Sequence, residues 1–387
     1  MSGRRVVVVG AGIGGLTAAV ALHRLGWEVT VHEQAARAAT GTGAGIVLAP
    51  NALRAFEAIG FDVERATGSA VSAAMGVRRP DGVWLNRADT AALVRRYGRP
   101  PLAVHRAALT GGLAAELPDG ALRYATTVEG VKGAEEETAR VRTGVGEVQA
   151  DVVIAADGIN SRLRRQYFPG HPGLHHSGER AWRTVVTAEG LPGLTTSETW
   201  GRGERFGIVP LADGRVYVYA TAFAPPGSRA ADVRAELARR FGGWHAPVPA
   251  LLERMEPAAL LQHDLYDLAA PLPRLHHGRI AWIGDAAHAM TPNLGQGGCQ
   301  AVEDAVVLAH LLHRAGPGAV PAALAAYSAA RRERTDAIRV RSRRAGRVAG
   351  LRNPLAAGAR NLAVRAAPGR LALRALDDLY DGFALPA

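Results

Sequence analysis

The order of apolar and polar positions predicts parallel strands toward both ends of the chain. Residues 4–33 contain a strand, a glycine turn, a helix and a second strand, about the length of one βαβ unit. Residues 151–158 and 279–285 each contain a short apolar run that ends in a turn, as buried strands do. Helices are expected from about Pro50 to residue 60, at the stretch VHRAALTGGLAAEL, and over most of the chain after residue 285.

The middle of the chain has a different pattern. Between about residues 178 and 275, stretches such as RAWRTVVTAE, RFGIVPL and RVYVYATAF predict an antiparallel sheet, and residues 75–86 predict a hairpin that turns at Pro80–Gly82. We therefore expect an α/β fold in which a β-sheet substrate domain is inserted into a discontinuous nucleotide-binding domain. The predicted ranges are 1–72, 101–177 and 278–345 for the nucleotide domain, 73–100 and 178–277 for the substrate domain, and 346–387 for C-terminal helices.

Size and composition indicate an ordinary folded protein of the cytoplasm. The 387 residues are 48% hydrophobic, which is enough to form a sizeable core. No apolar run approaches the length of a membrane helix. Cys299 is the single cysteine, so an internal disulfide is impossible and nothing suggests secretion.

The net charge of +11 comes from the C-terminal part of the chain. Residues 331–374 carry 13 arginines and only two acidic residues, which accounts for the whole excess. An anionic partner such as nucleic acid or a membrane surface is one interpretation. No aromatic interleaving or groove-reading motif accompanies the arginines, so we interpret them as a solvated helical face and expect no nucleic-acid partner.

A dinucleotide site is predicted at the first glycine turn. Gly10, Gly12 and Gly15, with Gly14 between them, follow a strand and open a helix, and acidic Glu33 ends the second strand. The glycines permit a tight turn and close approach to a pyrophosphate, while the helix N-terminus presents unpaired N–H groups. The carboxylate of Glu33 would accept hydrogen bonds from the ribose hydroxyls and would repel a 2′-phosphate, which favours FAD or NAD over NADP at this site.

Two further strand ends carry aspartates, and the complete set of motifs resembles a known family. Asp157-Gly158 ends one strand and Gly284-Asp285 ends another. Together GAGIGG, Glu33, ADGINSRLRR and GDAAHAMTPNLGQGGCQAVEDA resemble the single-component (group A) FAD-dependent aromatic monooxygenases of the para-hydroxybenzoate hydroxylase fold. The resemblance covers nearly the whole chain and is nearest to urate hydroxylases and tetracycline-modifying monooxygenases.

The resemblance implies a Rossmann-like FAD-binding domain and a set of cofactor residues. Asp285 would contact the flavin ribose, Asp157 and Gly158 would serve FAD and transient NADH or NADPH, and Arg106 would lie close to the flavin side chain. Pro292, Gly295, Gly297 and Gly298 would lie at the isoalloxazine, where a helix N-terminus would stabilise negative charge on the reduced ring. That helix is expected to be amphipathic, with Val302 and Val306 on its apolar face and Glu303 on another.

The implied reaction is hydroxylation of an aromatic or conjugated small molecule, including polycyclic natural products. FAD would be reduced by NAD(P)H and would react with O2 to a flavin C4a-hydroperoxide that transfers its distal oxygen. An oxidase, a reductase or an epoxidase on the same fold is the alternative, and a non-enzymatic interaction protein that uses the basic tail is a third class. We expect a monomer or a homodimer without a metal site or a membrane span.

Substrate-positioning residues are expected on the inserted sheet. Alternation places Tyr217, Tyr219 and Thr221 on one face, and Arg205, Gly207 and Val209 on one face of the neighbouring strand. Arg205 and Tyr217 stand where related urate hydroxylases have a substrate-contacting arginine and tyrosine. Those enzymes have an aspartate at the position of Asn293, which puts urate in doubt as the substrate. Trp182, Trp200 and Phe206 are expected in the core.

Overall fold

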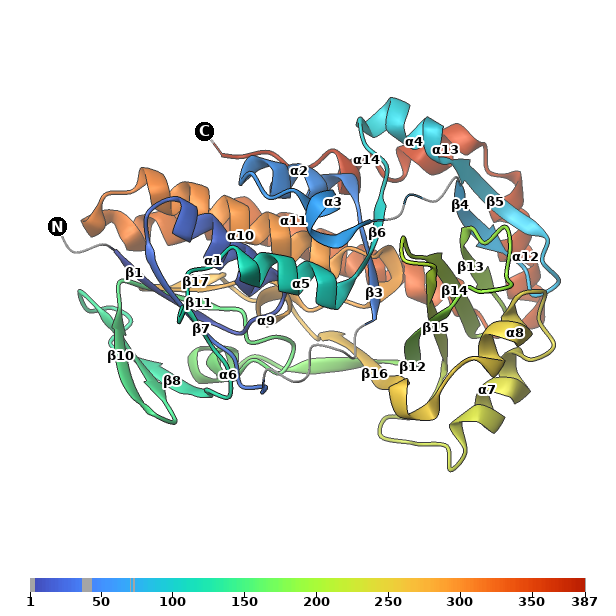
Figure 1. Ribbon diagram of the computed structural model, residues 1–387, viewed down its shortest axis with the longest axis horizontal. Helices are drawn as coiled ribbons and strands as arrows, with labels where there is room; N and C mark the ends of the chain where they lie inside the picture. Colours follow the sequence, from blue (N-terminus) through green and yellow to red (C-terminus); the bar gives the residue numbers. More distant parts are fainter. Residues whose placement is uncertain (1–3, 37–43, 70, 72–73, 387) are drawn as a thin grey trace.

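Residues 4–36, 44–69, 71 and 74–386 are described by the computed structural model of the chain (Figure 1). Within these residues, a first sheet has six strands in the order β17-β18-β11-β1-β2-β7. All neighbours are parallel except β17 and β18, so the predicted parallel strands are confirmed. The strand bounds are β1 Arg5–Val9, β2 Glu28–His32, β7 Leu122–Arg123, β11 Val152–Ala155, β17 His276–His277 and β18 Ile280–Trp282.

This parallel sheet is covered on both faces. Helices α1 (Ile13–Arg24), α10 (Gly297–Arg314) and α11 (Val320–Ala349) lie over one face (Figure 1). A small antiparallel sheet packs on the other face, with strands β8 (Val128–Lys132), β9 (Ala139–Thr143) and β10 (Gly146–Ala150). Because neither face is left to solvent, the strands are continuous apolar runs such as the four valines of β1, all of them buried.

The β insert is a seven-stranded sheet within the described residues, in the order β16-β12-β15-β14-β13-β4-β5. All neighbours are antiparallel except β13 and β4, so the predicted antiparallel sheet and the hairpin at Pro80–Gly82 are confirmed. The bounds are β4 Ala74–Arg78, β5 Trp84–Asp89, β12 Leu174–Thr187, β13 Thr196–Trp200, β14 Glu204–Pro210, β15 Arg215–Phe223 and β16 Leu261–Leu268.

The two faces of the seven-stranded sheet have different neighbours. Trp182, Phe206 and Val218 point outward, in a core with helices α7 (Val233–Phe241) and α8 (Val248–Glu253), which the sequence pattern did not predict. The opposite face, called the inner face below, carries Tyr217 and Val209. It packs against a short strand pair that belongs to the nucleotide-binding part, β3 (Gly45–Leu48) and β6 (Leu102–His105). The inner face therefore looks toward the first sheet (Figure 1).

The C-terminal part consists of helices, as predicted. After α11 come α12 (Pro354–Ala366), α13 (Gly369–Arg374) and α14 (Asp377–Tyr380), and α12 packs against β5. The predicted boundary at residues 72 and 73 falls outside the described residues, and α11 continues past residue 345, so the domain ranges stay a prediction. No helix in the described part of the chain is long and apolar enough to cross a membrane.

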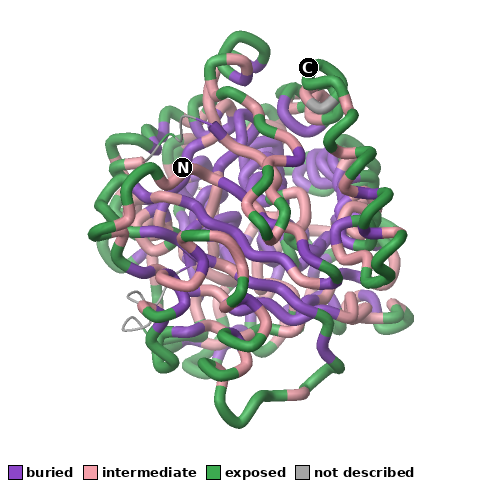
Figure 2. Tube along the Cα trace, turned by 90° about the vertical axis from the view of Figure 1, so that its right-hand side faces the viewer, coloured by how far each residue is buried: buried purple, intermediate pink, exposed green. Residues whose placement is uncertain are grey.

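The interpretation of the C-terminal arginines as a solvated face is wrong for several of them. Arg331, Arg339 and Arg360 are each less than a tenth exposed. Figure 2 shows how buried and exposed stretches alternate along the chain. Arg339 donates to the backbone carbonyl of Leu268 and Arg360 to that of Ala349, so these side chains join separate elements. Residue type and net charge did not distinguish buried arginines from exposed ones.

Candidate functional site

The first glycine turn presents backbone without side chains at the start of α1. Gly10 has φ of +104°, and a Cβ there would lie 2.4 Å from the carbonyl oxygen of Ala156. A Cβ at Gly15 would lie 2.0 Å from the carbonyl oxygen of Gly10, so both positions require glycine. Gly12 is the N-cap of α1, and within residues 4–36, 44–69, 71 and 74–386 its Cβ would meet no atom within 4 Å and no side chain caps the helix. Uncapped N–H groups beside open space fit a pyrophosphate.

Glu33 follows β2 and is tied to the same turn. Its Oε2 accepts a hydrogen bond from the backbone N–H of Ala11 at 2.8 Å, and its Oε1 accepts one from Ala35 at 2.8 Å. The carboxylate is therefore fixed beside the glycine loop, and each oxygen keeps a free lone pair. This geometry suits the ribose contact that the sequence predicts.

Asp157 and Gly158 lie at the end of β11, next to Gly10. One carboxylate oxygen of Asp157 accepts from the N–H of Arg162 at 2.8 Å, which orders the start of α6 (Arg162–Tyr167). The other carboxylate oxygen is buried and has no hydrogen-bond partner among the described residues. A buried acceptor without a partner is costly in a folded protein and suits a hydroxyl of a bound cofactor.

Asp285 is exposed although both of its chain neighbours are buried. It begins the short helix α9 (Asp285–His288) after Gly284, whose φ of +56° makes a sharp turn at the end of β18. The backbone around Asp285 is held from behind, because the N–H of Gly284 donates to Asp304 at 2.9 Å. The carboxylate thus points away from the core on a rigid support, as a ribose contact would require.

The loop from residue 292 to residue 298 lies beside Asp285. Pro292 opens a 3-10 turn (Pro292–Leu294), Gly295 ends it with φ of +63°, and no side chain among the described residues caps the start of α10. A Cβ at Gly297 would lie 3.8 Å from Oδ1 of Asp285, so the predicted ribose and ring contacts are adjacent. A Cβ at Gly298 would lie 2.7 Å from the side chain of Ile46 on β3. The second glycine-rich helix start thus lies between Asp285 and β3.

One small residue of α10 brings these segments together. A Cβ at Gly14 would lie 3.0 Å from the Cβ of Ala301, and a Cβ at Gly284 would lie 2.9 Å from it. The helix of the first glycine motif and the turn before Asp285 therefore both pack closely on Ala301. The sequence analysis did not single out Ala301, because a lone alanine in a helix carries no signal of its own.

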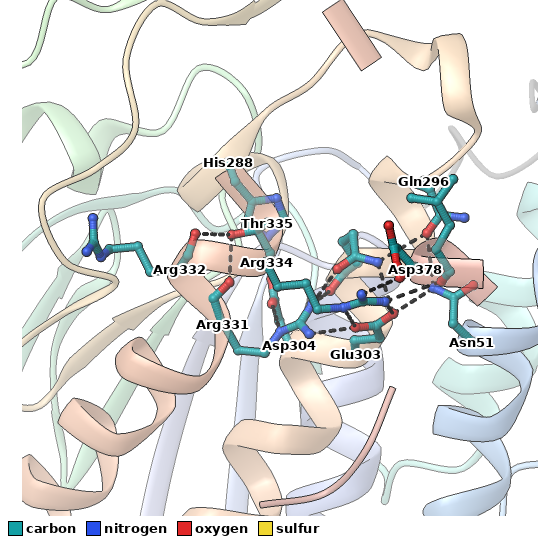
Figure 3. Close-up of polar contacts among 12 residues, drawn as sticks. Asn51, His288, Gln296, Glu303, Asp304, Arg331, Arg332, Arg334, Thr335 and Asp378 are labelled. Atoms are coloured by element: carbon teal, nitrogen blue, oxygen red, sulfur yellow. Dashed lines mark hydrogen bonds and ion pairs between the residues drawn. The ribbon is translucent and has the colours of Figure 1, made fainter. Parts of the chain in front are cut away.

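A buried ionic cluster lies behind the loop, formed by Glu303 and Asp304 of α10 and Arg331 of α11 (Figure 3). All three side chains are almost completely buried, and Arg331 contacts Glu303 at 2.5 Å and Asp304 at 2.8 Å. The expectation that Glu303 lies on a polar outer face of α10 is therefore wrong. Its charge is accommodated in the core because Arg331 and Arg334 both donate to it.

The ionic cluster contacts two of the segments that are predicted to bind the cofactor. Asp304 accepts from the N–H of Gly284 and from Nε2 of His288. On the other side, Glu303 accepts from Asn51, and Asn51 also donates to Gln296, the N-cap of α10. One network thus supports the turn before Asp285 and the start of α10. Burial disfavours the charge of Asp304, but His288 and Arg331 outweigh it and lower its pKa to about 2.

The predicted substrate residues lie together on the inner face. The rings of Tyr217 and Tyr219 are 5.7 Å apart, and the hydroxyl of Tyr219 donates to Glu198 at 2.5 Å. Tyr217 packs against β3, since a Cβ at Gly45 would lie 2.5 Å from its side chain. Burial and the charge of Glu198 raise the pKa of the Tyr219 hydroxyl well above its ordinary value, so it remains a hydrogen-bond donor.

Arg205 is buried, and its guanidinium joins the sheet to the loop before α10. It donates to Glu179 through two hydrogen bonds, to Thr221 at 3.0 Å and to Oδ1 of Asn293 at 2.5 Å. Burial opposes its charge, but Glu198 and Glu179 outweigh that effect and raise its pKa. The two glutamates were not predicted as site residues. The alternation of side chains along β12 and β13 could have placed both of them on the inner face.

The remaining predictions have mixed outcomes. Trp182 and Phe206 lie in the core, as expected, whereas Trp200 is half-buried and donates to Glu198, so that expectation is wrong. Arg106 is the first residue of α5 (Arg106–Ala115) and its side chain is exposed; its charge acts on Tyr217. No group of His, Cys, Asp and Glu side chains within the described ranges could hold a metal ion.

Comparisons with known proteins show which sequences and structures this chain resembles. The FAD binding domain family matches residues 4–342. The chain is 39% identical over 367 residues to aurachin C monooxygenase/isomerase from Stigmatella aurantiaca, which covers 94% of each chain. It is 33% identical over 386 residues to 2-heptyl-3-hydroxy-4(1H)-quinolone synthase from Pseudomonas aeruginosa, covering 97% of this chain and 98% of that relative.

A solved structure confirms the fold. Klebsiella pneumoniae HpxO complexed with FAD and uric acid superimposes with a TM-score of 0.90 at 28% identity, over 99% of this chain and 98% of that one. The predicted α/β fold, with its inserted antiparallel sheet and C-terminal helices, is the fold of that protein.

Proposed function

The chain belongs to the FAD binding domain family, among the group A flavin monooxygenases, and on that premise we propose that it uses NAD(P)H and O2 to hydroxylate a conjugated heteroaromatic small molecule. The observation that best supports this proposal is the hydrogen bond between Arg205 and Asn293, which fixes the inner face of the sheet to the loop before α10. A flavin ring at that loop and a substrate on that face would be neighbours.

The cofactor residues divide into three groups in this proposal. The first glycine turn, Glu33, Asp157 and Gly158 would hold the adenosine and the pyrophosphate, while Asp285 and Arg106 would hold the flavin ribose and side chain. The backbone from Pro292 through Gly295, Gly297 and Gly298 would lie against the ring, with the N-terminus of α10 nearest its negative edge. The bound flavin would accept a hydride from NAD(P)H and supply the two-electron chemistry that activates O2.

The protein's own task is to orient the substrate and keep water out. Tyr217, Tyr219 and Val209 provide a largely apolar surface, and β3 closes one side of it. Glu198 and Tyr219 offer a carboxylate and a neutral hydroxyl that could hold a substrate N–H or O–H in place. The named compounds of two relatives, aurachin C and a quinolone, favour a substrate with a fused or conjugated ring.

The test is anaerobic reduction of the FAD-loaded protein by NADH and by NADPH, followed by admission of O2 with candidate aromatic compounds. A substrate should accelerate flavin reduction and should yield one oxygenated product for each NAD(P)H consumed. Product formation without added nicotinamide would instead identify an oxidase. Purified protein that releases no flavin on denaturation would reject the proposal.

A further inference from the structure

Among the described residues, one arginine on the inner face of the seven-stranded sheet has no ion-pair partner. Arg183 on β12 is in register with Tyr219 of β15 and with Leu261 of β16, so these three side chains lie on one face. Arg183 is half-buried, and within residues 4–36, 44–69, 71 and 74–386 its guanidinium has no hydrogen-bond or ion-pair partner. A partly desolvated cation without a partner is unfavourable, and such groups are candidates for ligand binding.

Other arginines on the same sheet are satisfied by carboxylates. Arg180, on the opposite face of β12, donates to Asp264 at 2.8 Å. Arg205 on β14 donates to both oxygens of Glu179. These two buried arginines are therefore paired with carboxylates, and Arg183 departs from that pattern at the position opposite Tyr219.

The charge of Arg183 acts on the predicted substrate surface. Burial raises the pKa of Tyr217, and the positive charges of Arg183 and Arg106 oppose that rise. Burial lowers the pKa of His263, and Arg183, Arg229 and Arg106 lower it further. His263 is therefore neutral at physiological pH. Glu198 adds to the rise at Tyr217 and Asp264 opposes the fall at His263, but Glu198 accepts from Tyr219 and Asp264 accepts from Arg180. Neither carboxylate pairs with Arg183 in the described part of the chain.

The inner face also carries apolar side chains near Arg183. Val185 on the same strand, Val47 of β3 and Leu261 of β16 are partly buried side chains that pack against the cluster around Tyr217. A ligand that fits this surface needs a flat apolar body and one negatively charged oxygen. The charged oxygen would lie at Arg183, and the body would lie on Tyr217 and Tyr219.

We propose that Arg183 binds an anionic oxygen of the substrate, a ring carboxylate or the oxyanion of an acidic ring hydroxyl. This inference rests on the proposed function and deepens it, because it names the charge of the substrate and the residue that recognises it. The phosphates of NAD(P)H also bind guanidinium groups, so the experiment distinguishes the two sources of negative charge.

The experiment titrates the FAD-loaded enzyme with matched aromatic acids and amides, and follows the flavin absorbance. The pairs are salicylate with salicylamide and quinoline-4-carboxylate with quinoline-4-carboxamide. We expect an acid to bind about 10- to 100-fold more tightly than its amide, as a charge-assisted hydrogen bond would give. Arg183→Gln should remove this preference, and Arg183→Lys should keep part of it because the charge remains but the planar fork is lost.

Arg142→Gln is the control, because it removes the same charge from an exposed arginine on β9, in the small sheet at the far end of the molecule (Figure 1). Equal binding of acid and amide by the unmodified enzyme, including no binding of either, would contradict the proposal. So would an acid preference that survives Arg183→Gln.

Reduction by NADPH and by NADH separates the second source. Arg183→Gln could instead raise the KM for NADPH alone and leave the acid preference unchanged. In that case Arg183 would bind the phosphate of the co-substrate and the proposal would be wrong. FAD content and reduction by NAD(P)H test the proposed function by themselves, so that function can hold while the acid preference fails.

Discussion

Arg205 donates a hydrogen bond to Asn293 at 2.5 Å, and this contact joins β14 to the turn that precedes α10. Asn293 is fixed on its other side as well, since its amide nitrogen donates to Thr291 at 2.8 Å and to the carbonyl of Ser342 at 3.0 Å. An amide can accept from the arginine and donate to the carbonyl at the same time, which a carboxylate cannot do. The asparagine at this position is therefore suited to its neighbours.

Replacing Arg205 by alanine should separate cofactor retention from the response to substrate. The variant loses the tie between the inner face and the loop, while the glycine turn and Glu33 are untouched. We expect FAD to stay bound and the acceleration of flavin reduction by substrate to fall by at least about tenfold, the effect of one charge-assisted hydrogen bond. Stopped-flow reduction with and without substrate measures this, and equal loss of FAD and of the substrate response would reject the assigned role.

The control for that experiment concerns Glu179. Burial raises the pKa of Glu179 and Arg205 opposes the rise, so removing Arg205 leaves a buried carboxylate without its partner. The double variant Arg205→Ala with Glu179→Gln removes this unpaired charge. It should recover thermal stability relative to the single variant while the substrate response stays low.

The ionic cluster behind the loop predicts a large loss of stability on replacing Arg331 with methionine. Glu303 and Asp304 would remain in the core without their shared partner, which typically costs about 3–5 kcal/mol. Because both residues support cofactor segments, FAD should also dissociate more readily. Denaturant unfolding measures the first effect and flavin fluorescence the second. Arg332→Met, at the exposed neighbouring position, should change the unfolding free energy by less than about 0.5 kcal/mol.

The sequence correctly predicted the strands, glycine positions and sheet faces that depend on short-range patterns. The apolar runs at Val6–Val9 and at residues 152–155 became parallel strands, and Gly10 and Gly15 are required by close backbone contacts only a few residues away or across one strand pair. Alternation also placed Tyr217 and Tyr219 on one face correctly, because a strand has a fixed period of two residues.

The contacts that depend on distant residues were not predictable in the same way. Glu303 and Arg331 are residue types that usually face water, and their burial follows from the packing of α11 on α10. Arg183 shows the same limit, since only the register of β12 with β15 and β16 reveals that it lies beside the tyrosines. Charge counts along the chain could not identify either group.

Asp304 predicts a specific dependence of stability on pH. Its pKa falls from 3.8 to about 2 on folding, so its ionised form is favoured in the folded state. The resulting stabilisation is complete above about pH 4 and is lost as the pH falls through 2, and it amounts to roughly 2 kcal/mol. The difference in unfolding free energy between the unmodified protein and Asp304→Asn should therefore shrink from pH 5 to pH 2. A constant difference over that range would contradict the assigned pKa.

Gly12 and Gly10 should respond differently to alanine, although both belong to one motif. A Cβ at Gly12 would meet no atom of the described residues within 4 Å, so Gly12→Ala should fold with an unchanged melting temperature in the absence of FAD. The same methyl group would occupy the space where we place the pyrophosphate, and FAD affinity should fall at least tenfold, about 1.4 kcal/mol. Gly10→Ala should instead impair folding, because its Cβ would lie 2.4 Å from a backbone oxygen at φ of +104°. Thermal melts of the flavin-free proteins and FAD titrations measure the two effects, and normal FAD affinity in Gly12→Ala would place the pyrophosphate elsewhere.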